Sequence, residues 1–222
     1  MPLLTIDPKT ARDFDDAVHA MPDTDPPISG GWIIHVAIAD VAFHVPPNSA
    51  LDVEARRRGN SCYFPDRVVP MLPEKLSNDL CSLRPGEERA CLAARMQFDR
   101  NGRKLSHKFV RGIMKSAARL TYEQVEAARH GRTDQATESL VEPVLSPLWK
   151  AYGSLSRARD RRAPLDLNLR EREISLSSDG HVEHIGWKTN LEAHRLIEEF
   201  MIQANVSAAE TLAEHKLPTI YR

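Results

Sequence analysis

Apolar and polar positions along the chain predict strands alternating with helices. The run WIIHVAIADV, residues 32–41, is rich in β-branched residues and has the length of a largely buried strand. Residues 91–98 and 103–113 flank the turn sequence Asp99-Arg100-Asn101-Gly102, which predicts a hairpin. The pattern over residues 172–187 predicts a second hairpin in the same way.

End signals mark two short helices in the first part of the chain. Ser49 is a good N-cap and Gly59 a good C-terminal residue for a helix over residues 49–59. Thr121 and Gln124 have the spacing of a capping box, which predicts a helix that runs to about residue 130.

Two longer helices are expected further along the chain. One covers residues 143–162, and the other starts at a capping box of Thr189 and Glu192 and runs to about His215. Their expected core-facing residues are Leu145, Leu148, Tyr152 and Leu155 in the first, and Ile197, Met201, Ala204, Ala208 and Leu212 in the second. Helices mixed with hairpins indicate an α+β fold with a mixed, largely antiparallel sheet and packed helices, not a regular βαβ winding.

Composition is that of a globular protein and excludes several classes. The 222 residues are 41% hydrophobic and 27% charged, and the net charge of -1 gives no overall attraction to nucleic acid or membrane. The three cysteines are far apart, which fits neither a zinc knuckle nor a disulfide framework and favours a reducing, cytoplasmic setting. The apolar runs stop short of the roughly 20 residues that span a bilayer, and no signal peptide is apparent. No membrane and no organic cofactor are expected.

The first residues concentrate negative charge. Close carboxylates raise one another's pKa and resist joint burial, so a folded site that keeps them ionised needs a compensating cation. Four aspartates stand within ten residues: Asp7, Asp13, Asp15 and Asp16.

The spacing of the aspartates excludes two common acidic motifs. Residues 13–17 resemble the D-x-D-x-T motif of haloacid-dehalogenase-type phosphatases, but Lys-Thr-Ala-Arg before them makes a poor buried strand and Ala17 replaces the threonine. An EF-hand loop counted from Asp13 would need glycine and glutamate where Val18 and Thr24 stand. A solvated acidic loop and a two-metal phosphodiesterase site holding Mg²⁺ or Mn²⁺ both remain compatible with the spacing.

The sequence TIDPKTARDFDDA resembles the opening signature of the RNB catalytic domain of the ribonuclease II and ribonuclease R family, and is more similar to the ribonuclease R branch. The family consists of hydrolytic exoribonucleases that degrade single-stranded RNA from its 3′ end and release nucleoside 5′-monophosphates. Four further segments resemble RNB segments in the same order, namely HVAIADV (35–41), YFPDRVVPMLP (63–73), LSNDLCSLRPG (76–86) and LIEEFMI (196–202).

The resemblance implies roles for individual residues. Asp7, Asp13 and Asp16 match the family's magnesium-ligand positions, which hold two ions in a complete site, and Asp15 matches the aspartate on which catalysis depends most. Tyr63 matches a tyrosine that packs on the terminal nucleotide.

Three further positions match RNA contacts of the family. Tyr122 and Glu199 match contacting residues, although spacing alone places Glu199 on a solvated helix face. Leu167 stands where many members have a phenylalanine, so stacking there is reduced to apolar contact. On the strand over residues 32–41, we expect Asp40 to be a hydrogen-bonded structural aspartate and His35 a satisfied core histidine.

The resemblance also implies that residues 1–222 form the N-terminal portion of a single RNB domain. The missing C-terminal half would carry an arginine that contacts the scissile phosphate, and the flanking cold-shock and S1 domains of the family, both OB folds, are absent. The isolated chain is therefore expected to be weakly active or inactive. The alternative is a non-catalytic RNB scaffold that binds RNA or a protein.

Overall fold

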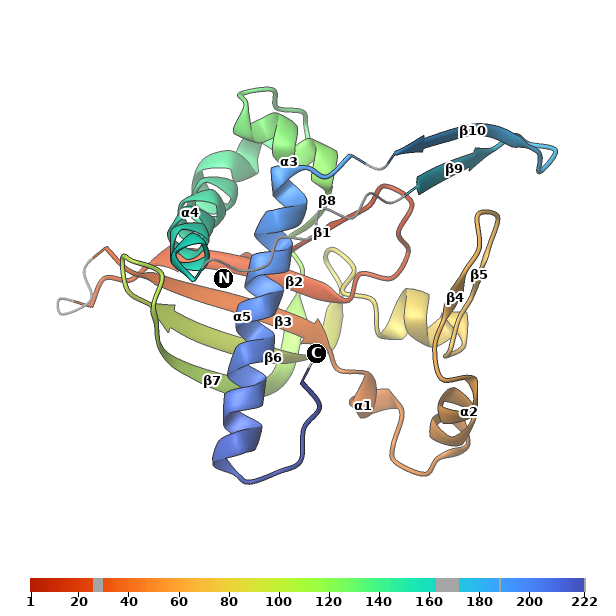
Figure 1. The fold of residues 1–222 in the computed structure, drawn as a ribbon, viewed down its shortest axis with the longest axis horizontal. Helices are drawn as coiled ribbons and strands as arrows, with labels where there is room; N and C mark the ends of the chain where they lie inside the picture. Colours follow the sequence, from red (N-terminus) through yellow and green to blue (C-terminus); the bar gives the residue numbers. More distant parts are fainter. Residues whose placement is uncertain (26–29, 163–171, 188, 222) are drawn as a thin grey trace.

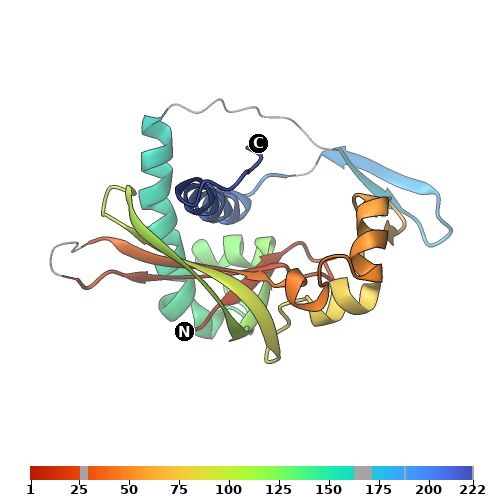
Figure 2. The same cartoon turned by 90° about the horizontal axis from the view of Figure 1, so that it is seen from below.

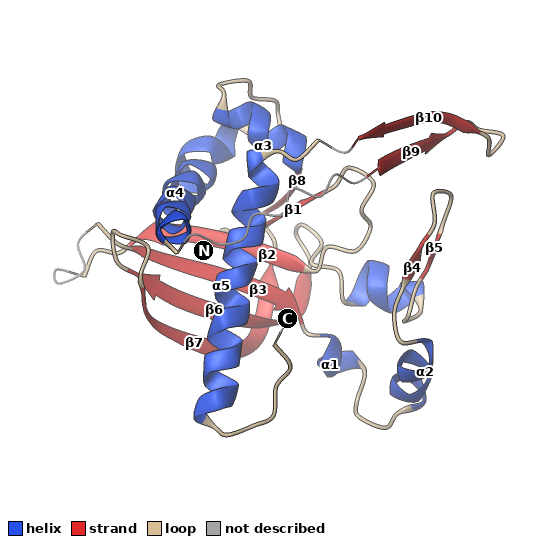
Figure 3. Cartoon of the chain, in the orientation of Figure 1, coloured by secondary structure: helices blue, strands red, loops and turns tan. Residues whose placement is uncertain are grey.

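A six-stranded sheet forms the centre of the molecule (Figures 1 and 3). The computed structural model describes residues 1–25, 30–162, 172–187 and 189–221. The strand order is β7-β6-β3-β2-β1-β8, and neighbours are antiparallel except for the parallel pair β1 and β8. The strands are β1 (Leu4–Asp7), β2 (Asp16–Pro22), β3 (Trp32–Ala39), β6 (Glu88–Phe98), β7 (Lys104–Lys115) and β8 (Ala118–Thr121).

Helices pack beside and across this sheet, and Figure 2 shows α5 lying over one of its faces. The α-helices are α1 (Val41–His44), α2 (Ala50–Arg58), α3 (Tyr122–Arg129), α4 (Ser146–Arg161) and α5 (Glu192–Glu214). Among the described residues, the shorter helical segments are the π-helical η2 (Leu76–Leu80), the 3-10 helix η3 (Glu138–Leu140) and the π-helical η4 (Val141–Leu145). In the described ranges, no helix combines the length and the apolar character needed to cross a membrane.

Two small hairpins stand apart from the main sheet (Figure 1). One pairs β4 (Cys62–Tyr63) with β5 (Val68–Val69), and the other pairs β9 (Arg172–Leu176) with β10 (Val182–Trp187). The second hairpin confirms the sequence prediction for residues 172–187.

The core has two parts, one on each face of the sheet. The larger part joins alternate residues of the strands, such as Ile6 and Val36, to α3, α4 and α5 through side chains such as Phe200. The smaller part lies on the other face, where Leu76 and Leu83 pack on Ala37. Alternation of apolar residues along the strands produces both contacts, because successive side chains point to opposite faces.

Most predicted elements are confirmed. Ser49 accepts a hydrogen bond from the Asp52 amide at 3.2 Å and Gly59 ends α2 with a φ of 80°. Thr121 and Gln124 form the reciprocal capping box of α3. The mixed, largely antiparallel sheet with packed helices confirms the predicted α+β class.

Three predictions about the long helices are wrong in part. The helix expected from residue 143 becomes α-helical only at Ser146, because η4 precedes it, although all four of its expected core residues are buried. The expected Thr189 capping box is absent: α5 begins at Glu192, and the Leu191 amide donates to Nδ1 of His194 at 3.0 Å.

The buried face of α5 also differs from the expected seam. Ile197 and Ala204 are buried, but Met201, Ala208 and Leu212 are only half-buried. The side of α5 that packs on the sheet is rotated about the helix axis relative to the expected seam. It includes polar residues, which a prediction from apolar positions does not select. This side carries Ala193, Leu196, Phe200, Gln203 and Ser207.

Candidate functional site

The four aspartates lie at one edge of the central sheet. Asp7 is the last residue of β1 and Asp16 the first residue of β2, the antiparallel neighbour of β1. The loop of residues 8–15, called the aspartate loop below, joins these two strand ends and carries Asp13 and Asp15. A strand-loop-strand turn thus returns the chain to its starting edge and brings the ends of β1 and β2 that carry Asp7 and Asp16 to neighbouring positions.

Burial and mutual repulsion perturb these carboxyl groups. Burial raises the pKa of Asp7 to about 7, with the Asp16 carboxylate adding to the effect. Burial likewise raises the pKa of Asp16 to about 6, with a contribution from Asp15. The pKa of Asp15 is raised by burial and by Asp13. The site therefore favours protonation unless a cation is present.

The donor set suits a hard divalent cation. Oδ2 of Asp7 and Oδ2 of Asp16 are both buried and have no hydrogen-bond partner, and such orphaned carboxylate oxygens are costly without a compensating ligand. Carboxylate oxygens are the ligands that Mg²⁺ and Mn²⁺ prefer. Within the described ranges, no three His, Cys, Asp or Glu side chains are gathered closely enough to hold an ion by themselves. The residues present fit a metal whose coordination other oxygens complete.

Two segments remote in sequence fix the backbone of the aspartate loop. The Ser82 hydroxyl accepts from the Phe14 amide at 3.0 Å and donates to the Arg12 carbonyl at 3.2 Å. The Leu83 amide donates to the Phe14 carbonyl, and the Ala39 amide to the Asp15 carbonyl, each at 2.8 Å. In the sequence, segment 76–86 is recognisable only as a family-like motif, and no local signal indicates its contact with the loop.

Two tyrosines predicted to contact RNA lie within electrostatic range of the aspartates. Tyr63 on β4 is 70% exposed, and its pKa is raised by partial burial and by Asp13 and Asp15. Tyr122, the first residue of α3, has its pKa raised to about 12 by burial and by Asp16 and Asp7. Its ring stacks on His194 with centroids 4.0 Å apart. The Tyr63 ring is thus open to solvent, whereas the Tyr122 ring is packed against His194.

Glu199 is not on a solvated face. Its side chain is 1% exposed, Oε1 accepts from Gln203 Nε2 at 3.0 Å, and Oε2 is buried without a partner. Arg162 Nη2 lies 3.8 Å from Oε1. The prediction from spacing was wrong because α5 packs on the sheet along a stripe that includes this position. Leu167 lies outside the described residues.

Asp40, which follows β3, matches its predicted role, whereas His35 within β3 does not. Arg111 binds Asp40 with two hydrogen bonds, Nε to Oδ2 at 2.6 Å and Nη2 to Oδ1 at 2.9 Å, which confirms the structural role predicted for Asp40. His35 lies opposite His19, but its buried Nδ1 has no partner, so the expected satisfied core histidine is wrong in this respect.

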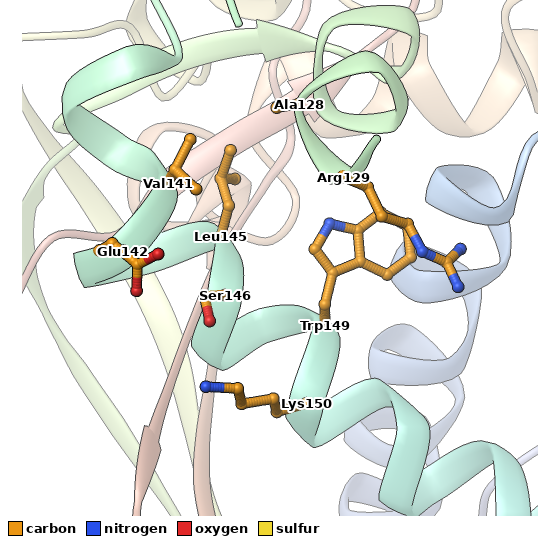
Figure 4. A pocket seen from close by; sticks show the side chains of 8 residues that line it. All are labelled: Ala128, Arg129, Val141, Glu142, Leu145, Ser146, Trp149 and Lys150. Carbon is orange, nitrogen blue, oxygen red and sulfur yellow. The ribbon is translucent and has the colours of Figure 1, made fainter. Parts of the chain in front are cut away.

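A pocket of about 260 Å³ lies between α3, η4 and α4, and none of the predicted site residues lines it (Figure 4). The Arg129 guanidinium lies 4.3 Å from the centroid of the Trp149 ring in its wall. Its lining residues are Ala128, Arg129, Val141, Glu142, Leu145, Ser146, Trp149 and Lys150. The pocket is therefore separate from the aspartate site.

Fold and site together define an α+β domain with a carboxylate-rich site where two neighbouring strands meet. The chain belongs to the RNB domain family, whose model matches residues 1–222. It is 43% identical over 225 residues to Ribonuclease R of Vibrio parahaemolyticus and 42% identical to Ribonuclease R of Escherichia coli, with all of this chain covered in both cases.

Solved structures show the same fold. RNase R of Mycoplasma genitalium in complex with ribose methylated single-stranded RNA matches 97% of this chain with a TM-score of 0.90 and 32% identity. The same enzyme in complex with double-stranded RNA matches 98% with a TM-score of 0.91. The chain spans 26 to 27% of the length of the two curated relatives and 33 to 38% of the two solved chains.

Proposed function

We propose that this chain supplies the metal-holding part of the active site of a 3′ to 5′ exoribonuclease that releases nucleoside 5′-monophosphates from single-stranded RNA. The observation that carries the proposal is the pair of buried, unpartnered oxygens on Asp7 and Asp16, with Asp13 and Asp15 on the loop between them. The relatives named Ribonuclease R support the reaction class.

Each aspartate has a distinct proposed role. Asp7, Asp13 and Asp16 hold the ions, and Asp15 is the catalytic residue that orients the attacking water toward the last phosphodiester. Two Mg²⁺ or Mn²⁺ ions, when bound, would stabilise negative charge on the attacking and leaving oxygens. The hydrogen bonds that hold the backbone of the aspartate loop limit how far Asp13 and Asp15 must move when ions and RNA bind.

The RNA end is proposed to meet residues from three elements. Tyr63 offers an exposed ring on which a terminal base stacks without regard to its identity. Tyr122 and Glu199 are proposed to contact the ribose-phosphate end, since a carboxylate that accepts from a 2′-hydroxyl distinguishes RNA from DNA. Leu167 is assigned an apolar contact with the same nucleotides. The solved RNase R complexes with RNA support an RNA substrate.

The domain assignment is part of the proposal. Residues 1–222 are the N-terminal portion of one RNB domain, and the relatives, which are three to four times longer, support a parent protein with further domains. A non-catalytic scaffold is the less favoured alternative, because four mutually repelling carboxylates would have no purpose in it.

An assay of the full-length protein with Asp15→Asn tests the function. We expect the variant to stop releasing nucleoside monophosphates from a 5′-labelled single-stranded RNA in Mg²⁺, while its affinity for that RNA stays within about twofold, because asparagine has nearly the same shape and the proposed RNA-contacting side chains are unchanged. Asp160→Asn on the exposed side of α4 is the matched control and should keep full activity. Unchanged turnover by the Asp15 variant would refute the assignment.

A further inference from the structure

Ser82 joins two stretches of chain that are far apart in sequence. Its side chain is fully buried, and its hydroxyl donates one hydrogen bond to the aspartate loop and accepts another from it. The acceptor is the Arg12 carbonyl and the donor is the Phe14 amide, which are the backbone groups on either side of Asp13. One hydroxyl therefore fixes the peptide groups that set the direction of the Asp13 side chain.

Neighbouring backbone groups extend this attachment to Asp15. The Leu83 amide donates to the Phe14 carbonyl at 2.8 Å, and the Ala39 amide donates to the Asp15 carbonyl at 2.8 Å. Four backbone atoms between Arg12 and Asp15 are thus held from outside the loop. Leu83 and Ala39 hold these atoms through backbone amides, whereas Ser82 does so through its side chain. A substitution at Ser82 can therefore remove its hydrogen bonds.

Ser82 is itself held by the largely covered side chain of Arg89. Nε of Arg89 donates to the carbonyl oxygens of Ser82 and of Asp79, each at 3.1 Å, and its Nη2 donates to Asp79 Oδ1 at 3.1 Å. The Arg89 side chain is only 12% exposed. Arg89 therefore holds the turn that carries Ser82 in place beside the aspartate loop.

The loop needs such an anchor because its carboxylates repel one another. Without a cation, Asp13 and Asp15 gain hydration and lose repulsion by moving outward into water. A serine opposes this movement well, because a hydroxyl both donates and accepts and has little side-chain entropy to lose. Alanine at this position would leave a Phe14 amide without its partner.

We propose that Ser82 is a positioning residue that holds Asp13 and Asp15 in the geometry required for metal binding and hydrolysis. This inference rests on the proposed function and names a residue outside the ligand set. Ser82 does not contact the RNA or the ions; it acts through the backbone of the aspartate loop.

The test compares Ser82→Ala, Ser82→Thr and the control Ser116→Ala in the full-length protein. Ser116 is also buried, 2% exposed, but its hydroxyl bonds the Ala118 carbonyl and not the aspartate loop. For Ser82→Ala we expect the hydrogen-exchange rate of the Phe14 amide to rise by about tenfold or more. We also expect Mn²⁺ affinity and kcat each to fall by about tenfold or more, with KM for RNA unchanged. Ser82→Thr should restore each value to within about threefold, and Ser116→Ala should leave them unchanged.

The outcomes separate this role from a general effect on folding. The inference is overturned if Ser82→Ala keeps Phe14 protection and Mn²⁺ affinity within about twofold of the wild type, or if Ser116→Ala loses as much. If the wild-type protein releases no nucleoside monophosphates, the proposed function fails, and Ser82 is then judged by Phe14 exchange and Mn²⁺ affinity, which need no RNA.

Discussion

Arg119 on β8 donates from Nη2 to the carbonyl oxygen of Pro8 at 2.6 Å, and so attaches the start of the aspartate loop to the strand beside β1. The same nitrogen lies 3.2 Å from the Lys9 carbonyl, and the guanidinium lies 5.3 Å from the centroid of the Phe14 ring. Burial dominates the pKa of Asp7, but the charge of Arg119 partly offsets that increase. The aspartate loop is thus held on a second side by a permanent cation.

Replacing Arg119 should therefore lower both the stability of the folded protein and its affinity for Mn²⁺. We expect Arg119→Ala to lower the free energy of unfolding by about 1 to 3 kcal/mol, because charge-assisted hydrogen bonds to two carbonyls are lost. Urea denaturation in EDTA measures this change. Arg129→Ala, which removes a guanidinium stacked on Trp149 and distant from the loop, is the control for Mn²⁺ affinity. Equal losses of Mn²⁺ affinity in the two variants would argue against a specific role of Arg119.

Asp7 should make the metal-free protein less stable as the pH rises. Its folded pKa of about 7 lies above the ordinary 3.8, so the folded chain binds more protons than the unfolded chain between these values. The stability due to protonated Asp7 is complete below about pH 4 and is lost as the pH rises through the folded pKa. Relative to wild type, Asp7→Asn in EDTA should gain about 4 kcal/mol between about pH 4 and about pH 8, because it removes the difference between the folded pKa of about 7 and the ordinary 3.8. A stability difference that does not change with pH would contradict this.

Adding metal should reverse that loss of stability at neutral pH. A cation that binds only the folded site stabilises it by mass action, by about 2.7 kcal/mol at 100 times its dissociation constant. Thermal unfolding with increasing Mg²⁺ or Mn²⁺ measures the gain. Asp7→Asn and Asp16→Asn should abolish it, and Asp160→Asn should keep it. A gain of the same size in all of these proteins would indicate ion binding elsewhere.

Tyr63 should matter for RNA affinity and not for folding. Its ring is 70% exposed, so Tyr63→Ala loses little packing but removes a stacking surface worth about 1 to 3 kcal/mol per base. Fluorescence titration with a short single-stranded RNA measures this loss. Tyr63→Phe should bind like the wild type, and Phe43→Ala, at another exposed ring, should leave affinity unchanged. If Phe43→Ala lowered RNA affinity as much as Tyr63→Ala, Tyr63 would have no specific role in stacking on the RNA.

Gly102 in the β6-β7 turn should resist substitution. It has a φ of 78°, and an added Cβ would collide with the Ser154 carbonyl oxygen on α4. We expect Gly102→Ala to lower the free energy of unfolding by about 2 to 4 kcal/mol, as backbone strain adds to overpacking. Gly180 has the same φ but open space around it, so Gly180→Ala should cost only about 1 kcal/mol. Similar losses at both positions would mean that the contact with α4 is unimportant.

Local signals in the sequence predicted the elements well where the structure is local. The cap at Ser49, the capping box at Thr121 and the turn at residues 99–102 act over a few residues, and the fold keeps all three. Predictions failed where tertiary packing decided the outcome. The burial of Glu199 depends on how α5 lies on the sheet, which apolar spacing does not report. At the start of α5, the Ala193 amide donates to Glu126 of α3, a contact between segments 67 residues apart.

The sequence by itself determined the acidic character of residues 7–16 and the α+β class, because these follow from residue type and spacing, and its resemblance to the RNB family supplied the candidate ligands. Only the tertiary structure decided that Ser82, Ala39 and Arg119 hold the aspartate loop. It also decided that Asp7 and the Oδ2 atom of Asp16 are buried at adjoining strand ends. The physical reason is that hydrogen bonds and desolvation depend on distances between segments up to 111 residues apart in the chain. The local pattern of the sequence does not contain those distances.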